Sequence, residues 1–391
     1  MSKSIFLAIT MLFASICSVA FGADSTDYPD ANWDQTYGGE LNISVFTYRD
    51  LNLNGQYDLG DRAMAGVIVE MTGNGKTIRE TSNINGFANF RMSATQSKME
   101  VTSPATYRFE VIPPPGVVIT SGNAVQTSDF KALPSAPADM FAVTPPIPVG
   151  LGPDLSVSGQ LVQAGDPPLV ADANTLANTQ VSVTSPDGTV ASVVTDAKGH
   201  FEFHAAPGKW TVSYGTGASA ITRTVTVKDA AVYLGVLSDN SGVSGTEHVA
   251  TFDDLGIMSV NKVPSGYAGM TWRNFVGVQQ EYYGGQGYVN TTESGQFVSY
   301  GGSGHPAFVA STTPFTFVGG YFGVGWTAGQ GETLNVRAYR GDQLAYVDQI
   351  KLSALTPVYY APNFSGVTRV EFSTSHYWQF ICDDLRFVLP Q

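Results

Sequence analysis

The residues best suited to chemistry lie in one short acidic stretch. Seven of them, spaced mostly at alternate positions, are Asp50, Asn52, Asn54, Gly55, Gln56, Asp58 and Asp61. Counted from Asp50, the acids and amides fall where a twelve-residue EF-hand-type loop places its oxygen ligands, Gly55 falls at its sharp turn, and Gln56 falls where a backbone carbonyl binds. Hard cations prefer such oxygen sets, so the spacing predicts a calcium loop.

The context of this loop favours a structural role over a sensing role. Its last position is Asp61, which is shorter than the usual Glu and predicts a weak site of ~10⁻⁴–10⁻³ M affinity. Leu41, Ile43 and Val45 alternate with polar residues before the loop, so it follows a strand and not an amphipathic helix. The loop would then hold strands together, and the alternative is an acidic, solvated β-turn.

A second acidic set lies near the two ends of the C-terminal third. Asp253 and Asp254 stand near its start, and Asp383 and Asp384 stand near its finish. If the first and last strands pair, these carboxylates would converge on a second calcium ion. The equally open alternative is that one Asp of each pair caps a turn while the other faces water.

The same C-terminal third is rich in aromatic residues, and sugars stack their C–H faces on such rings. Most of these aromatics are expected in the core, because aromatic residues favour strands. Four lie in polar or glycine-rich surroundings and are predicted to face a ligand: Tyr282, Tyr283, Tyr288 and Trp378.

No motif in the chain specifies a reaction, and we expect no enzyme. His200, Glu202 and His204 share one face of a predicted strand, but no further zinc ligand is specified and a solvated face is favoured. Cys382 sits in an apolar strand and is predicted to be a buried, inert thiol. Neither a nucleophile elbow nor a His-Glu-x-x-His helix is present.

The N-terminus predicts export. Lys3 precedes the apolar run 5–14, and small residues at Ala20 and Gly22 suit a signal peptidase that cleaves after Gly22. Cleavage would remove Cys17 and leave Cys382 alone, so no intramolecular disulfide is expected. No later stretch is apolar enough to span a membrane. A net charge of −13 argues against nucleic-acid binding. The predicted location is secreted or periplasmic.

The rest of the sequence predicts an all-β protein with several units. Its 42 glycines and 21 prolines accompany short alternating strands and turn signals such as Asn85-Gly86. The predicted organisation is a signal peptide at 1–22, a polar leader at 23–39, a β-sandwich at 40–132, a Pro-rich linker at 133–153, a second β-sandwich at 154–237, a linker at 238–248 and a larger unit at 249–391.

Two family resemblances support this plan. The calcium loop with 65–69 and 85–90 resembles the B-type repeats of Gram-positive surface adhesins. The stretch 195–203 with Pro207-Gly208 resembles carboxypeptidase regulatory-like domains. Both resemblances imply small, non-catalytic sandwiches of prealbumin-like fold. The aromatic third resembles a jelly-roll module of exported bacterial proteins, which implies carbohydrate or galactose-type binding.

The expected function is therefore that of an exported, non-enzymatic, modular binding protein. Two spacer units, the first stapled by calcium, would present a C-terminal module that binds carbohydrate or another surface ligand. The alternatives are a purely structural matrix component and, less favoured, a carbohydrate-active enzyme whose site the sequence does not mark.

Overall fold

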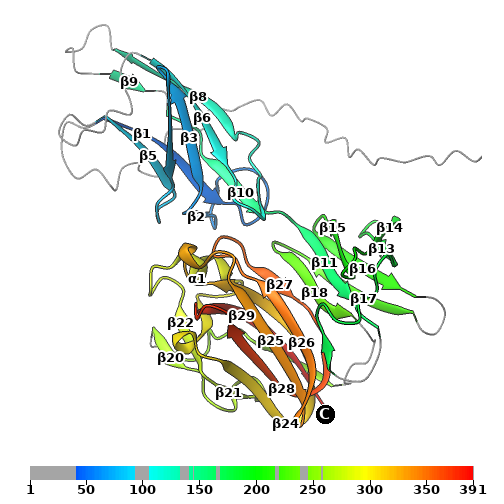
Figure 1. Ribbon diagram of the computed structural model, residues 1–391. Helices are drawn as coiled ribbons and strands as arrows, with labels where there is room; N and C mark the ends of the chain where they lie inside the picture. Colours follow the sequence, from blue (N-terminus) through cyan, green and yellow to red (C-terminus); the bar gives the residue numbers. More distant parts are fainter. Residues whose placement is uncertain are drawn as a thin grey trace, which may run out of the picture.

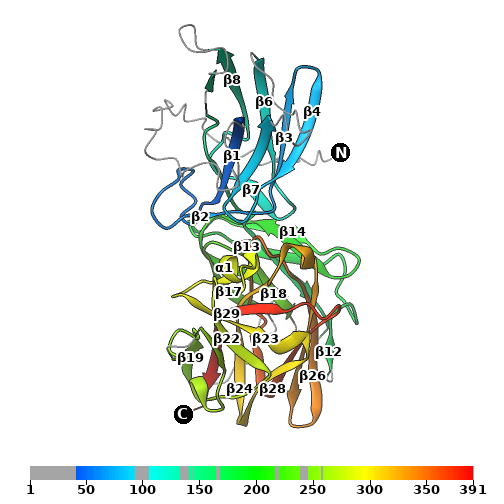
Figure 2. The same ribbon diagram turned by 90° about the vertical axis from the view of Figure 1, so that its left-hand side faces the viewer.

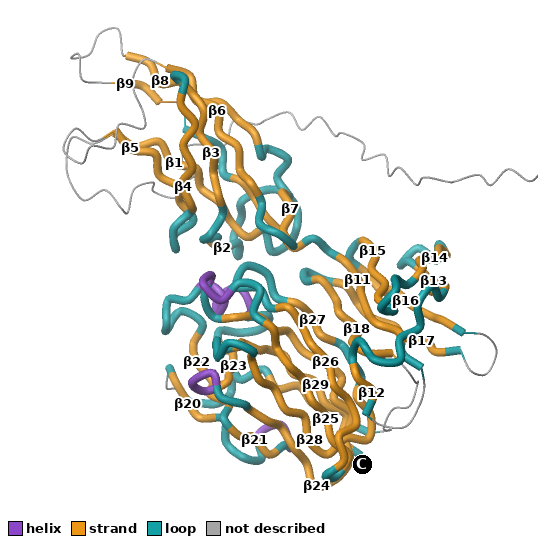
Figure 3. Tube along the Cα trace, viewed as in Figure 1, coloured by secondary structure: helices purple, strands orange, loops and turns teal. Residues whose placement is uncertain are grey.

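The computed structural model describes residues 41–92, 105–132, 141–143, 145–163, 168–215, 220–237, 245–256 and 259–390. These residues fold almost entirely into β-strands, arranged as three units (Figures 1 and 3). The predicted all-β class is confirmed. The predicted signal peptide at 1–22 and leader at 23–39 lie outside the described residues.

The first unit is a sandwich of two five-stranded sheets, as the alternating pattern predicts. One sheet contains β1 (Leu41–Arg49), β2 (Arg62–Ala63), β5 (Phe87–Met92), β7 (Val117–Ile119) and β10 (Val149–Pro153). The other contains β3 (Ile68–Gly73), β4 (Lys76–Thr81), β6 (Ala105–Ile112), β8 (Val125–Ala132) and β9 (Phe141–Val143). Val45 and Phe90 from the first sheet bury against Val69 and Phe109 from the second.

The stretch 133–153 is not a linker along its described part, which corrects the prediction. Strand β9 pairs with β8, and β10 lies parallel to β1, with Val149 opposite Thr47. The prolines misled the sequence reasoning because they signal linkers and turns. Here Pro148 lies between strands and Pro153 ends β10, where a missing N–H does little harm to a sheet.

The second unit packs a four-stranded sheet against three further strands. The four-stranded sheet contains β13 (Gln180–Thr184), β14 (Val190–Val194), β16 (Gly208–Tyr214) and β17 (Ile221–Val227). The facing strands are β11 (Ser156–Leu161), β15 (His200–His204) and β18 (Ala231–Leu237), while β12 (Leu169–Val170) lies apart. Val157 and Leu234 meet Val183 and Val212 in its core.

The third unit is the largest and is built around one long strand. Its strands are β19 (Thr246–Ala250), β20 (Val260–Lys262), β21 (Thr271–Arg273), β22 (Phe275–Gln279), β23 (Phe297–Gly301), β24 (Ala307–Val324), β25 (Thr333–Arg340), β26 (Gln343–Lys351), β27 (Val358–Tyr360), β28 (Phe364–Thr374) and β29 (Phe380–Leu389). Short 3-10 turns lie at Tyr267–Gly269, Gly302–Gly304 and Thr327–Gly329, and α1 spans Gln286–Thr291.

The first and last strands of the third unit pair, as the sequence reasoning required. Ala250 of β19 lies opposite Leu385 of β29. Because β19 begins at Thr246, the predicted linker at 238–248 extends too far, and its last residues belong to this sheet.

The second and third units share one sheet, which the sequence analysis did not predict. Strand β18 lies between β11 and β27 and runs parallel to both, with Val232 opposite Tyr359. Strand β12 also pairs in parallel with β26. Fifteen strands from the two units therefore form a continuous sheet.

The first unit stands on the α1 end of the third unit in both ribbon views (Figures 1 and 2). Leu355 of the third unit is buried in the core of the first. A Cβ on Gly66 would lie 3.4 Å from the Leu355 side chain, so the two surfaces are closely packed. The Arg62 guanidinium donates a hydrogen bond of 2.6 Å to the Val289 carbonyl of α1.

Candidate functional site

The acidic loop is held by its own carboxylates. Asp50 is buried, and its two oxygens accept hydrogen bonds from the backbone N–H groups of Asn54, at 3.1 Å, and Gly55, at 2.7 Å. Asp61 accepts from the N–H groups of Leu51, at 2.9 Å, and Asp58, at 3.0 Å. The carboxylates at both ends of the loop therefore fold it back on itself.

The remaining predicted ligands meet in the same loop. The side-chain amides of Asn52 and Asn54 donate to the Asp58 carboxylate, at 3.1 and 2.8 Å, and the Gln56 N–H donates to Asn54 Oδ1 at 2.7 Å. A calcium ion would need the two asparagines to turn their oxygens inward. No group of three His, Cys, Asp or Glu side chains stands ready to hold a metal within the described ranges.

Charge and backbone shape both suit a cation in this loop. Burial raises the pKa of Asp61, hydrogen bonds from Leu51 and Asp58 oppose that rise, and the nearby Asp58 and Asp50 carboxylates add to it. A bound cation would relieve this mutual repulsion. Gly55 has φ +78°, and a Cβ there would lie 2.8 Å from the Thr120 carbonyl oxygen. The sequence reasoning on glycine at this turn is confirmed.

Each of the four carboxylates of the second acidic set accepts hydrogen bonds from donors of its own. Asp253 accepts from the N–H groups of Gln296, at 2.7 Å, and Phe297, at 3.1 Å, while Asp254 accepts from the Tyr267 hydroxyl at 2.8 Å. Turn capping, the alternative that the sequence left open, describes this pair well.

Asp383 and Asp384 also accept hydrogen bonds from segment 293–297, the segment that Asp253 contacts. Asp383 is buried and accepts from the N–H groups of Glu293, at 2.8 Å, and Ser294, at 3.2 Å. Asp384 accepts from the Ser294 hydroxyl at 2.7 Å and lies 3.6 Å from Arg386. Burial raises the pKa of Asp383 well above its usual range. A calcium ion shared by the two pairs stays a prediction.

The four aromatic residues predicted to face a ligand belong to one row of contacting rings. Tyr282 and Tyr283 are 54% and 40% exposed, with ring centroids 4.9 Å apart. Tyr283 lies 5.5 Å from Tyr288, which lies 5.4 Å from Trp326, and Trp326 lies 6.4 Å from Trp378. The structure thus joins positions that are almost a hundred residues apart in sequence.

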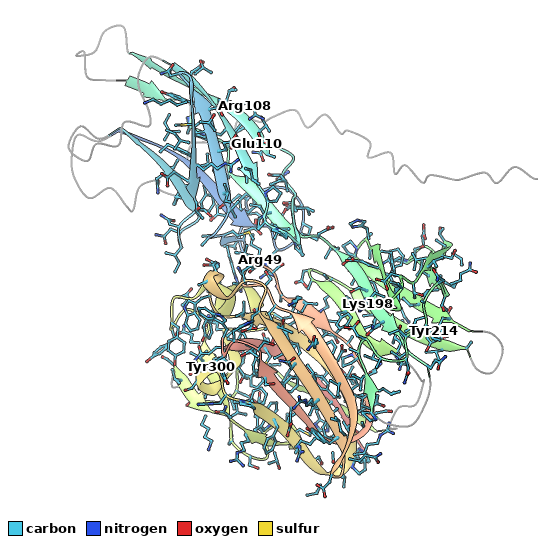
Figure 4. The ribbon with its side chains drawn as sticks, viewed as in Figure 1. Arg49, Arg108, Glu110, Lys198, Tyr214 and Tyr300 are labelled. Carbon is cyan, nitrogen blue, oxygen red and sulfur yellow. The ribbon has the colours of Figure 1, made fainter. Side chains whose placement is uncertain are left out.

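Tyr288 does not fit the expectation of a ligand-facing ring, because it is fully buried. It lies on α1 and donates its hydroxyl to the Gln379 side chain. Tyr300, labelled in Figure 4, packs on Tyr288 and Tyr283, and its hydroxyl lies 2.9 Å from that of Tyr283. Tyr288 and Tyr300 therefore pack beneath Tyr283, which in turn contacts Tyr282. Trp378, the fourth predicted residue, is half-buried.

A pocket of about 390 Å³ opens between the first and third units, and it is lined by chain neighbours of Tyr282 and Tyr283 and not by the two tyrosines themselves. The first unit contributes Arg62, Ala63, Ile84 and Asn85, and the third contributes residues on either side of the tyrosines, from Gln280 to Val289. The sequence reasoning missed this pocket because its two walls come from units separated by the whole second unit.

A cluster of charged side chains around the buried Arg49 includes residues from all three units. Arg49 of β1 is 2% exposed and donates to the Asn290 carbonyl of α1, at the junction visible in Figure 4. Burial lowers the pKa of Arg49 to about 10, although the negative charges of Asp229 in the second unit and Glu293 in the third act to raise it. Burial and the Asp229 carboxylate raise the pKa of Glu293. Lys228 lies 3.6 Å from Glu293.

Another buried carboxylate lies where the second and third units share their sheet. Asp348 of β26 is fully buried and accepts hydrogen bonds from the hydroxyls of Tyr233, at 2.9 Å, and Tyr360, at 2.8 Å. Tyr233 belongs to β18 of the second unit. Burial raises the pKa of Asp348 to about 6, while the hydrogen bonds that it accepts counteract the rise.

The histidines of β15 and Cys382, which could in principle bind a metal or act as a nucleophile, lie in surroundings that specify neither role. Glu202 and His204 are exposed, and His204 Nδ1 lies 3.2 Å from Asp154, so the predicted solvated face is confirmed. His200 lies 3.7 Å from Asp196. Cys382 is buried as predicted, and burial raises the pKa of its thiol well above the usual range.

One family model matches part of the chain. It is described as a protein of unknown function (DUF1416) and covers residues 150–238, which correspond to the second unit and to less than half of the chain. No curated protein matches the sequence. In the part of the chain that the structure describes, no helix has the length and apolar character needed to cross a membrane.

Solved structures share only distant similarity with this chain. The Bacillus anthracis TIE protein is 11% identical over 85% of this chain and 43% of that one, with a TM-score of 0.21. The CBM51-2 and INT domains of Clostridium perfringens ZmpB are 12% identical over 59% and 47%, with a TM-score of 0.23. The chain spans less than half the length of both, and at such TM-scores neither likeness carries an argument about function.

Proposed function

We propose that the protein is an exported, non-enzymatic binding protein whose third unit binds carbohydrate. The observation that carries this proposal is the exposed pair Tyr282 and Tyr283, with rings 4.9 Å apart and buried rings behind them. Exposed aromatic rings offer flat apolar faces to the C–H faces of sugars, and a ring fixed in place loses little entropy on binding. The hydrogen bond between the hydroxyls of Tyr283 and Tyr300 restrains one of the two.

The binding test uses a glycan array and the full chain. Tyr282→Ala and Tyr283→Ala should each weaken binding by about tenfold or more, because aromatic anchors carry much of the energy of a binding site. Tyr377→Ala is the matched control, since Tyr377 is a highly exposed tyrosine of the same unit outside the ring row. Absence of binding across the array would favour the rival proposal of a purely structural component. Turnover of an arrayed polysaccharide would support the third alternative, a carbohydrate-active enzyme.

The proposal includes a calcium staple in the first unit. Asp50, Asp58 and Asp61 place three carboxylates in one loop, and Asn52, Asn54 and the Gln56 carbonyl supply neutral oxygens of the kind that calcium binds. The loop connects β1 to β2, so a bound ion would stiffen the strand that carries Arg49 to the junction.

Calorimetric titration and thermal melting of the full chain test the staple. With a Kd of about 1 mM, about 10 mM Ca²⁺ should add about 1.4 kcal/mol to the stability of the first unit. Asp58→Asn should abolish the calcium-dependent shift, while Asp342→Asn, an exposed turn residue of the third unit, should retain it. An Asp58→Asn protein that still responds to calcium would refute this site.

Export is the remaining part of the proposal. It is supported by the apolar run 5–14 and by the small residues Ala20 and Gly22. N-terminal sequencing of the protein recovered from culture medium or periplasm should begin at Ala23. An intact N-terminus in the cell extract would contradict it.

A further inference from the structure

A pocket of about 320 Å³ lies where the second unit meets the third. The second unit contributes residues 223–226 of β17, Lys228 and Leu234, and the third unit contributes residues of β19, β24, β27 and β29. The two walls meet where β18 pairs with β27, side by side in Figure 1. The volume is in the range of small-molecule sites.

The charged residues that line this pocket are mostly cationic. Among the described residues, Arg223 and Lys228 of the second unit and Arg386 of β29 line it, against one acid, Glu247 of β19. The whole chain has a net charge of −13, so the lining is opposite in sign to the molecule as a whole. Such a lining favours an anionic ligand.

The acids that contact these cations leave them able to bind a ligand. Arg386 donates through Nη1 to Glu247 at 2.9 Å, and its Nη2 lies 3.6 Å from Asp384. Because a guanidinium carries five N–H donors, Arg386 can hold Glu247 and still donate to a ligand. Lys228 is 56% exposed and lies 3.6 Å from Glu293. Burial raises the pKa of Glu293, which makes this carboxyl less readily charged and weakens its hold on Lys228.

The rest of the lining suits a sugar ring better than a simple anion. The rings of Tyr321 and Tyr359 line the pocket with centroids 4.9 Å apart, and Tyr359 is half-buried. Thr224 and Thr226 are exposed on β17, and their hydroxyls can both donate and accept. A ligand here would meet aromatic surface, hydroxyls and cations together, which matches the C–H faces, hydroxyls and carboxylate of a sugar acid.

We propose that this pocket binds a uronic acid, a sugar whose carboxylate would meet Lys228 and Arg386 while its ring lies against Tyr359. The continuous sheet through β18 and β27 holds the two walls together before a ligand arrives, which lowers the entropy cost of binding. The inference goes beyond the proposed function, because Tyr282 and Tyr283 are not among the residues that line this pocket.

Calorimetric titration of the full chain with matched ligands tests the chemistry without changing the protein. At least one of glucuronate and galacturonate should bind. The amide of that uronic acid, which keeps the ring and loses the charge, should bind about tenfold more weakly or worse, and so should acetate, which keeps the charge and lacks the ring. A galacturonate oligomer that binds as well as the monosaccharide supports a polysaccharide end as the source, and one that fails to bind supports the free sugar acid.

Two variants test the two walls. Lys228→Gln and Arg386→Gln should each weaken uronate binding by about tenfold. Lys198→Gln is the control for the first, since Lys198 is 67% exposed and lies 3.9 Å from Asp172, outside the pocket. The exposed Arg337 of β25 provides the second control, Arg337→Gln. Unchanged melting temperatures would show that the variants fold, and the exposed Lys228 keeps the test valid if Arg386→Gln does not.

The outcomes separate this inference from the proposed function. Failure of both uronates to bind, equal binding of a uronate and its amide, or binding of acetate as tight as that of a uronate would each overturn the pocket. Uronate binding unchanged in Lys228→Gln and Arg386→Gln would do the same. Array binding that depends on Tyr282 would then leave the proposed function standing. Uronate binding that is lost in Lys228→Gln, with a silent array, supports the pocket and overturns the site at Tyr282 and Tyr283.

Discussion

The buried carboxylate Asp348 makes the sheet shared by the second and third units sensitive to pH. Burial raises its pKa from 3.8 to about 6, although the Tyr360 hydroxyl, the Gln349 N–H and the Tyr233 hydroxyl all donate to it. The substitution Asp348→Asn removes the titration and keeps the shape of the side chain.

The sign and size follow from proton linkage. Between pH 3.8 and about 6 the folded protein holds a proton that the unfolded chain has released, so stability falls as pH rises. The contribution is fully present below pH 3.8 and is lost as pH passes through about 6. A shift of this size corresponds to roughly 3 kcal/mol.

Urea denaturation of the full chain between pH 4 and pH 8 measures the effect. As pH rises, the wild type should lose about 3 kcal/mol of unfolding free energy relative to Asp348→Asn, because the variant has no carboxyl group to titrate at this position. Asp342→Asn, in the turn of the same β25–β26 hairpin, should parallel the wild type. Parallel curves for the wild type and Asp348→Asn across this range would refute the reasoning.

Three further predictions concern Arg49, Gly55 and Cys382. Arg49→Met should remove the buried hydrogen bond from the Arg49 guanidinium to the Asn290 carbonyl of α1, cost about 1–3 kcal/mol and let the first unit move away from the third. Small-angle scattering would detect the change as a larger radius, and the exposed Arg79→Met should have no such effect. Gly55→Ala should lower the melting temperature through about 1–2 kcal/mol of backbone strain and its clash with Thr120, and an unchanged melt would contradict that geometry. Cys382 should resist alkylation in the native protein and react on unfolding, as peptide mapping would show.

Local patterns in the sequence predicted the local structure well. The alternation at Leu41, Ile43 and Val45 predicted β1, the Asn85-Gly86 turn signal preceded β5, and the glycine of the acidic loop adopted the expected positive φ. Each of these features depends on residues a few positions apart, so a single stretch of sequence contains the information.

Features that depend on distant partners escaped prediction. The residues of β18 predict a strand, but they do not indicate that β27 pairs with it. Tyr288 looked like a surface ring, but the short helix α1 turns it inward onto Trp326. Gln286 gave no signal in the sequence, and it is buried on α1, where its amide nitrogen donates to the Ala63 carbonyl of the first unit.

The pairing of β18 with β27 bears on how this protein can be divided. The family match ends at residue 238, directly after β18, as though the second unit were an independent module. A fragment that ends there would leave unpaired the part of the β18 edge that lies against β27, at Ala231, Val232 and Tyr233. Open edges of this kind recruit other strands, so the isolated fragment should self-associate. The smallest autonomous piece that contains the second unit therefore includes the third.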